Sequence, residues 1–247
     1  MTSVPPHTPP PFPPEPPTPP TPPSPVVERF VLGPFETTSY LVWVPNPDQG
    51  GGGEPARAGA ECWIVDPSFE PEALVERARA LGVRVRGVVL THAHVDHIAG
   101  VVDVLSAFPG TPVMLHAAEE AWLNDPLLNL SMMMGLPVTA PGPDRVLRDG
   151  EELSLGGTRW RVMHTPGHSP GSVTLYHAGS GQALVGDLVM AGSVGRTDFP
   201  GSDGQMLVQS IKRRVYTLPD ETKLFPGHGP PTSVGRERRS NPFVRGE

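Results

Sequence analysis

The chain has 247 residues, a formal net charge of -7 at pH 7 and one cysteine. This acidic balance argues against nucleic acid or an anionic membrane as a partner, because both require a basic surface. No apolar run is long enough to span a membrane, and a lone cysteine forms no internal disulfide, so we expect a cytoplasmic protein.

Residues 1–25 form a proline-rich tail that holds 14 of the 34 prolines. Successive prolines remove hydrogen-bond donors and fix φ, so we expect a disordered, extended tail. It shows no basic region followed by an apolar segment, which argues against a secretory signal peptide. Its Pro-x-x-Pro spacing suits an aromatic groove on a protein partner, although a plain spacer is the commoner role. Residues 26–247 are left as one domain.

The first half of this domain alternates strands and helices. β-branched runs predict the strands, and the helix after Asp66 is predicted by Pro71 at its start, Gly82 at its end, and an apolar stripe between them. In chain order we expect strands at 26–35 and 39–44 with a turn at 36–38, a loop at 45–59, a strand at 62–65, a helix at 71–82, a strand at 85–90 and a helix at 98–108.

A dense cluster of ligand types, Thr91–Gly100, lies between the last two of these elements. On extended backbone His92 and His94 point to the same side, and the turn into the following helix brings Asp96 and His97 beside them. Imidazole nitrogen and carboxylate oxygen are the usual ligands of zinc, iron and manganese. The segment is therefore half of a predicted metal site.

The second half of the domain is richer in strands. Two sheets packed together with helices outside are expected from the whole pattern. The three methionines 132–134 are expected to be adaptable core filler in an irregular segment, with a loop that borders a pocket as the alternative. The expected elements are strands at 112–116, 153–155, 158–163, 173–176, 183–185 and 223–225, helices at 117–124 and 207–218, and the irregular segment 125–143.

Three more ligand types each follow a strand and a glycine: His168, Asp187 and His228. Loops that leave strand ends present functional side chains, and glycine lets the backbone approach closely. With the first cluster they make five histidines and two aspartates, enough for two metals that share one carboxylate. The histidines at 116, 164 and 177 lack this context and are expected to be structural.

These seven residues resemble the ligand set of the metallo-β-lactamase-fold hydrolases, and the resemblance covers residues 26–247. It implies an αβ/βα sandwich of two mixed β-sheets with helices on the outer faces, and two divalent metals, with zinc preferred over iron or manganese. The implied roles are His92, His94 and His168 on the first metal; Asp96, His97 and His228 on the second; Asp187 as bridge; Asp96 also as a catalytic residue; and Asp66 as a support behind the metal loop.

Within that family, segments 195–201, 226–230 and 239–243 are similar to the small glyoxalase II-like hydrolases. This implies cleavage of thioesters such as S-lactoylglutathione by a metal-bridging hydroxide. Arg196 is the candidate for a substrate carboxylate, with a structural arginine as the alternative. Full-length glyoxalase II has an extra helical domain after its last ligand, whereas 19 residues follow His228 here. We therefore expect broad tolerance of the thiol group.

Other activities fit parts of the same pattern. Gly195–Phe199 also resembles the persulfide dioxygenases, which would hold one iron on His92, His168 and Asp187. A lactonase is a weaker enzyme alternative, and a non-enzyme whose tail is the functional part is weaker still. An aspartate at 187, where several β-lactamases have cysteine, argues against antibiotic hydrolysis. Pro200–Gly201 and the terminal Asn-Pro-Phe favour the hydrolase.

Overall fold

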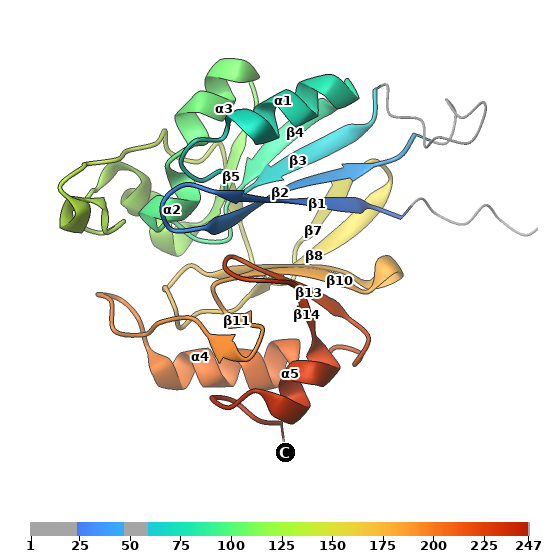
Figure 1. Ribbon diagram of the computed structural model, residues 1–247, viewed down its shortest axis with the longest axis vertical. Coiled ribbons are helices and arrows are strands. Elements are labelled where there is room, and N and C mark those ends of the chain that lie inside the picture. The colour runs from blue at the N-terminus through green and yellow to red at the C-terminus, as the bar shows by residue number, and fades with distance from the viewer. Residues whose placement is uncertain (1–23, 47–58, 247) are drawn as a thin grey trace, which may run out of the picture.

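The computed structural model describes residues 24–46 and 59–246, which build two facing six-stranded sheets with helices on the outside (Figure 1). The first sheet has the order β1 (Val26–Leu32), β2 (Thr37–Val44), β3 (Glu61–Val65), β4 (Arg84–Val89), β5 (Val113–His116) and β6 (Arg145–Leu147). The second has the order β14 (Thr232–Ser233), β13 (Lys223–Pro226), β10 (Gln182–Gly186), β9 (Val173–His177), β8 (Thr158–His164) and β7 (Glu152–Leu155). The expected sandwich is confirmed.

Both sheets are mixed. β1, β2 and β3 pair antiparallel, and β3 to β6 pair in parallel. In the second sheet β10 and β13 are parallel, and the other neighbours are antiparallel. Parallel neighbours end at the same edge of a sheet, so the loops after β3 and β4 emerge together, as do those after β10 and β13. Six of the seven candidate ligands follow β4, β10 or β13, and His168 lies in the loop after β8.

Helices cover the outer face of each sheet (Figure 1). On the first sheet these are α1 (Glu72–Leu81), α2 (Val95–Ile98) and α3 (Val101–Ala107). On the second they are α4 (Gly204–Ser210), which continues as the π-helical turn Ile211–Val215, and α5 (Val234–Ser240). β11 (Val189–Met190) and β12 (Ser193–Val194) pair as a separate antiparallel ribbon.

Apolar side chains fill three layers. Between the sheets, the rings of Trp63 and Trp160 meet edge to face with centroids 6.1 Å apart. Leu74 and other residues of α1 pack on the outside of the first sheet, and Leu207 of α4 packs on the second. β2 is buried along its whole length because both faces of its sheet are covered. Cys62 is a buried core residue, as expected.

The predicted helix at 71–82 is confirmed. Pro71 precedes its first residue, and Gly82 ends it in the left-handed conformation, with φ 62°. Leu74, Ala78 and Leu81 are all buried. Periodicity and end signals were sufficient here because the helix has one buried stripe on an otherwise polar surface.

Two boundaries in the first half differ most from the expectation. The first strand ends at Leu32 instead of residue 35, and the turn lies at Gly33–Glu36, where both end residues have positive φ. The helix expected at 98–108 is divided into α2 and α3 at Gly100. A Cβ at Gly100 would overlap the carbonyl oxygen of Ser68, so close backbone contact sets the break.

Two of the expected helices differ from the structure, one in its hydrogen-bond pattern and one in where it begins. The segment Ala117–Asn124 forms 3₁₀ turns, as does Ser131–Met134 inside the irregular segment. The helix expected at 207–218 begins earlier, at Gly204, where the Asp203 carboxylate accepts from the amides of Gln205 and Met206. Capping by the Asp203 side chain therefore extends the helix by about one turn before the first residue of the apolar pattern.

The predictions for the proline-rich tail, residues 1–25, and for most of the loop at 45–59 fall outside the described residues. Among the helices of the described part, none is long and apolar enough to cross a membrane.

Candidate metal centre

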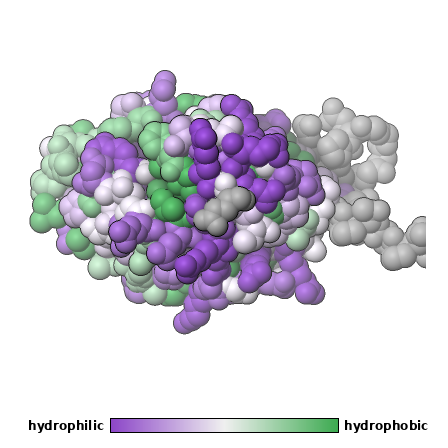
Figure 2. Space-filling model, turned by 90° about the horizontal axis from the view of Figure 1, so that it is seen from below, coloured by the Kyte–Doolittle hydropathy of each residue, from purple (hydrophilic) through white to green (hydrophobic). Residues whose placement is uncertain are grey.

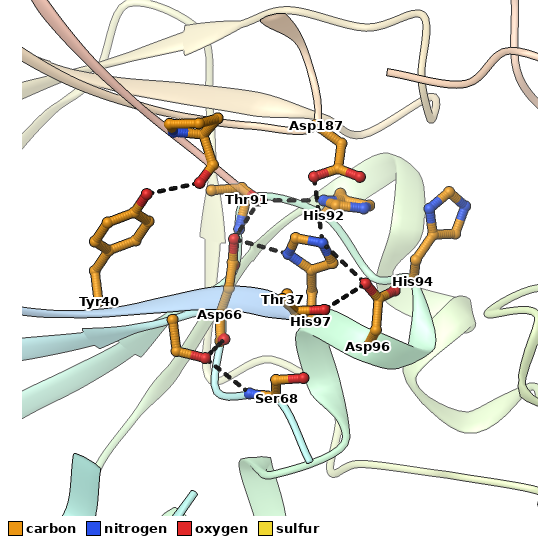
Figure 3. Close-up of polar contacts among 12 residues, drawn as sticks. Thr37, Tyr40, Asp66, Ser68, Thr91, His92, His94, Asp96, His97 and Asp187 are labelled. Atoms are coloured by element: carbon orange, nitrogen blue, oxygen red, sulfur yellow. Dashed lines mark hydrogen bonds and ion pairs between the residues drawn. The ribbon is translucent and has the colours of Figure 1, made fainter. Parts of the chain in front are cut away.

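The cluster after β4 has the predicted backbone. His94 precedes α2 in an extended conformation, with φ -69° and ψ 151°, and Asp96 and His97 lie in the helix. The extended residues and the helical turn thus bring their side chains to one place, between the ends of the two sheets (Figure 3). The second half contributes His168 from the loop after β8 and Asp187 just after β10.

All seven expected ligands converge in three overlapping groups. In each group the candidate ligand atoms lie within 4.8 Å of one another. The groups are His92, His94 and His168; Asp96, His97 and His228; and His92, His97 and Asp187. The third group takes one histidine from each of the others and adds the aspartate, which is the arrangement that a shared carboxylate requires.

Distances around Asp187 show the same sharing. Its Oδ1 lies 3.4 Å from His97 Nε2, and its Oδ2 lies 3.6 Å from His168 Nε2 and 3.5 Å from His228 Nε2. Asp96 Oδ2 lies 3.2 Å from His228 Nε2. One carboxylate therefore faces both groups, whereas the other faces the second group.

Unpaired buried atoms test whether a metal fits here. His92 Nε2, His94 Nε2, His97 Nε2 and Asp187 Oδ1 are buried and have no hydrogen-bond partner. Buried polar atoms without partners are costly, and they are uncommon in folded proteins. Four of them pointing into one small region, all of ligand types, fit divalent cations in the positions that the three groups define.

Electrostatics supports the same conclusion. Burial, followed by the neighbouring histidines, lowers the pKa of His92 well below its usual value and that of His94 to about 3. Both rings are thus neutral at pH 7, the form that binds a metal. Burial also acts to lower the pKa of His97, but Asp96, Asp187 and Asp66 outweigh it and raise the pKa well above normal. A position among three carboxylates that favours a proton also favours a metal cation.

Asp66 holds the metal loop from behind. It has positive φ, 50°, directly after β3. Its Oδ1 accepts from the amide of Thr91 at 2.7 Å, and its Oδ2 accepts from the hydroxyl of Thr91 at 2.6 Å and contacts His97 Nδ1 at 3.0 Å (Figure 3). This contact leaves Nε2 of His97 directed at the site, and such outer contacts orient ligands.

Two further contacts orient ligands. The Thr37 hydroxyl donates to Asp96 Oδ2 at 2.7 Å. His168 Nδ1 lies 2.8 Å from the carbonyl oxygen of Arg196, so Nε2 of that ring is directed at the site. Neither contact was foreseen, because both partners lie far from the ligand in sequence.

Sequence reasoning also missed Glu119, which is fully buried. Its Oε2 accepts from the amide of Ala93, between His92 and His94, and its Oε1 accepts from the amide of Gly171, each at 2.6 Å. One carboxylate thus joins the metal loop of the first half to the loop that follows His168. In sequence it belongs to the pair Glu119–Glu120 in a polar segment, where nothing distinguishes it from a surface residue.

The terminal Asn-Pro-Phe segment has a structural role near the site. Asn241 Nδ2 donates to the carbonyl oxygen of Ser193 and to Glu237 Oε2, both at 2.9 Å. Glu237 Oε2 also accepts from the amide of Gly192 at 2.9 Å. Both side chains are fully buried. They hold β12, whose residues line the cavity in front of the ligands.

That cavity has a volume of about 490 Å³, and five of the candidate ligands line it. Met133 and Met134 line it too, and Met132 and Met133 are exposed, so the prediction that the methionines 132–134 are core filler was wrong. They follow Leu130, which has a positive φ of 70° and also lines the cavity. The alternative drawn from the length of the segment, a loop that borders a pocket, agrees with the structure.

Arg196 lies at the rim of the cavity, and its role stays a prediction. Its Nε and Nη2 bind the carboxylate of Asp198 at 2.9 and 2.7 Å. Its Cζ lies 4.3 Å from the centre of the Phe199 ring. A substrate carboxylate would therefore compete with Asp198 for the paired edge of the guanidinium group.

Comparison with known proteins shows the family to which the chain belongs. The family model described as the metallo-beta-lactamase superfamily matches residues 56–228. The chain is 38% identical over 219 residues to the probable metallo-hydrolase YqgX of Bacillus subtilis, covering 88% of this chain and 97% of that one. It is 34% identical over 183 residues to the hydroxyacylglutathione hydrolase GloC of Haemophilus influenzae, covering 73% and 86%.

Solved structures of similar sequence share the fold of this chain. The BLEG-1 B3 metallo-beta-lactamase superposes with a TM-score of 0.78 at 37% identity, covering 89% of this chain and 99% of that one. The di-iron-bound form of TTHA1623 superposes with a TM-score of 0.71 at 36% identity, covering 88% and 100%.

Proposed function

The chain belongs to the metallo-beta-lactamase superfamily, and from this premise we propose that it hydrolyses thioesters with two divalent metal ions. The observation that carries the proposal is the convergence of three overlapping ligand groups on buried atoms without partners. Metallo-hydrolase relatives support the reaction class. The name of the Haemophilus relative makes S-lactoylglutathione the first substrate to test.

Each of the seven residues has a proposed role. When bound, two divalent metals supply an activated water and polarise the substrate carbonyl. We assign His92, His94 and His168 to the first position, Asp96, His97 and His228 to the second, and Asp187 to both. Asp96 lines the cavity, and its carboxylate is also the proposed acceptor of a proton from the attacking water. Thr37 and Asp66 hold the second group in orientation.

A thioester suits a cavity that offers no separate proton donor among its described lining residues. Among the described residues lining it, every titratable group except Arg196 is a candidate metal ligand. No separate lining acid is left to protonate a leaving group. A thiolate leaves without one because the pKa of a thiol is about 8.5, whereas an amine or alkoxide needs a proton.

Zinc is the proposed metal, and iron is the alternative. Imidazole and carboxylate donors suit zinc, iron and manganese. The di-iron form of TTHA1623 shows that a structural neighbour holds iron. Elemental analysis of protein purified without chelator should find close to two metals per chain. Asp187→Ala should empty both positions, whereas His228→Ala should empty mainly one.

Paired assays separate the hydrolase from the dioxygenase that the sequence left open. Metal-loaded protein should release thiol from S-lactoylglutathione and consume no oxygen with glutathione persulfide. Its activity should fall at least tenfold in His228→Ala. A protein that holds a single iron, consumes oxygen with the persulfide and keeps full activity in His228→Ala would contradict the proposal.

A further inference from the structure

Apolar side chains form the walls of the cavity around the candidate metal centre. Apart from the ligands, its lining includes Phe35, Leu130, Met133, Met134, Val194 and Phe199. These come from the β1–β2 turn, the irregular segment 125–143, β12 and the loop after it. The volume, about 490 Å³, suits a small organic ligand. Water gains few partners on such walls, so an apolar ligand group is favoured there.

Positive charge is scarce at the same place. Arg196 is the one arginine or lysine among the described residues that line the cavity. Two of its nitrogen atoms bind Asp198, and both side chains of this pair are about two-thirds exposed. Asp96 and Asp187 line the same cavity as candidate ligands of the metal ions. Apart from those metal ions, a substrate arm with two carboxylates, such as that of glutathione, therefore meets one arginine that already has a partner.

The apolar wall continues onto the surface. Met133 is 74% exposed, and the neighbouring Leu127, Met132 and Leu136 are exposed as well. This segment projects at the left of Figure 1, and hydrophobic residues gather on the same side in Figure 2. Contiguous exposed apolar side chains mark binding surfaces more often than plain solvent-facing loops. Methionine side chains also adapt to ligands of different shape.

Building on the proposed hydrolase function, we propose that the cavity takes thioesters with an unbranched apolar chain beside the scissile bond. The chain, on the acyl or the thiol side, lies along Leu130, Met133 and Met134 toward the rim. Each methylene removed from water adds binding free energy of similar size. The length of the apolar chain of the substrate therefore affects kcat/KM more than the presence of the glutathione carboxylates does.

Two substrate series test this with the metal-loaded full chain. The first holds N-acetylcysteamine as thiol and extends the acyl group from acetyl to octanoyl. The second holds acetyl and extends an alkyl thiol over the same range, with S-lactoylglutathione as comparator and free thiol as readout. In at least one series kcat/KM should rise by up to about fourfold per methylene. The longest member should exceed S-lactoylglutathione.

A variant with a matched control tests where the apolar chain of the substrate lies. Met133→Ser should flatten the dependence on chain length, whereas Met206→Ser, an exposed methionine on α4 outside the cavity, should leave it unchanged. A flat response in both series of an active enzyme overturns this inference but leaves the hydrolase proposal standing. Failure to cleave any thioester overturns both. An unchanged slope in Met133→Ser would overturn the inference. If the unmodified chain is a dimer on size-exclusion chromatography and Met133→Ser is a monomer, the apolar rim is assigned to contact between copies.

Discussion

Gly227 packs against two candidate ligands, Asp187 and His97, although it has no side chain that could bind a metal. A Cβ added there would overlap Asp187 Oδ1 and lie 2.7 Å from His97 Cε1. Its φ lies outside the left-handed region, so the position requires space and not an unusual backbone. The glycine next to His228 thus allows the second sheet to approach the metal loop of the first.

Gly227→Ala should displace Asp187 and His97 and reduce the bound metal. Misplacing reacting groups by about 1 Å costs on the order of 100-fold in rate, so kcat/KM should fall by about that factor. Gly142→Ala is the matched control, because its added Cβ meets nothing within 4 Å and its φ is ordinary. Metal content and kcat/KM measured on both variants decide the matter. Full metal content in Gly227→Ala would contradict the expected overlap.

Glu119→Gln should destabilise the fold, because both carboxylate oxygens accept backbone amides and glutamine offers one oxygen. One buried N–H would lose its acceptor, at a cost of about 1–3 kcal/mol in the free energy of unfolding. Denaturant unfolding measures this. Glu120→Gln, exposed and adjacent in sequence, should change stability by less than about 0.5 kcal/mol. Equal stability of the two variants would show that Glu119 is no structural link.

The ligands and one support, Asp66, were predicted from the sequence, whereas the supports Thr37 and Glu119 were not, for a physical reason. His92, His94, Asp96 and His97 fall within six residues after a strand, so local geometry alone brings them together. Glu119 acts through contacts to Ala93 and Gly171, which come together only when the two halves dock. A buried carboxylate that binds backbone amides leaves no periodic signal.

At the scale of elements, β5 and β8 meet through two histidines at their ends. The rings of His116 and His164 are stacked, with centroids 4.1 Å apart and planes 11° from parallel. Burial, followed by electrostatic repulsion from the His164 ring, lowers the pKa of His116, and Asp149 partly opposes this. The folded protein therefore favours the neutral His116 ring more than the unfolded chain does.

The sign of the resulting pH dependence follows from linkage. Above the unfolded pKa of about 6.5, His116 is neutral in both states and has no effect. As pH falls below that value the unfolded chain binds the proton first, so the free energy of unfolding decreases until the folded pKa is passed. His116→Phe keeps a flat ring without a proton site and should lose less stability between pH 7.5 and 5.5. Denaturant unfolding of metal-free protein at both pH values measures this. An identical loss in both proteins would exclude His116 as the source.

Element types were predictable where one face is buried, and boundaries were not where tertiary contacts set them. The helix at 71–82 has a single apolar stripe, so periodicity located it. The break between α2 and α3 depends on the approach of Gly100 to Ser68, and the end of β1 depends on the left-handed turn at Gly33. Apolar spacing does not record such contacts.

At the scale of the whole molecule, the candidate metal centre joins the two sheets. The first half supplies His92, His94, Asp96 and His97, and the second supplies the other three ligands. The two-sheet architecture could be predicted because each half repeats strands and helices. The side-chain contacts by which one sheet packs on the other could not be predicted, since they join residues far apart in sequence, such as Trp63 and Trp160. Bound metal strengthens the packing of the two sheets, because each proposed metal position takes ligands from both halves of the chain.

Metal removal should therefore lower the thermal stability of the whole domain. A ligand that binds the folded state alone stabilises it by about 2.7 kcal/mol when present at 100 times its Kd. For a domain of this size that corresponds to about 5–10 °C in Tm. Calorimetry of chelator-treated protein should show this decrease, and zinc should reverse it. In His228→Ala the difference between metal-loaded and metal-free protein should be smaller, because one position is lost. Equal Tm values with and without metal in the unmodified chain would show that the two sheets are seated by packing alone.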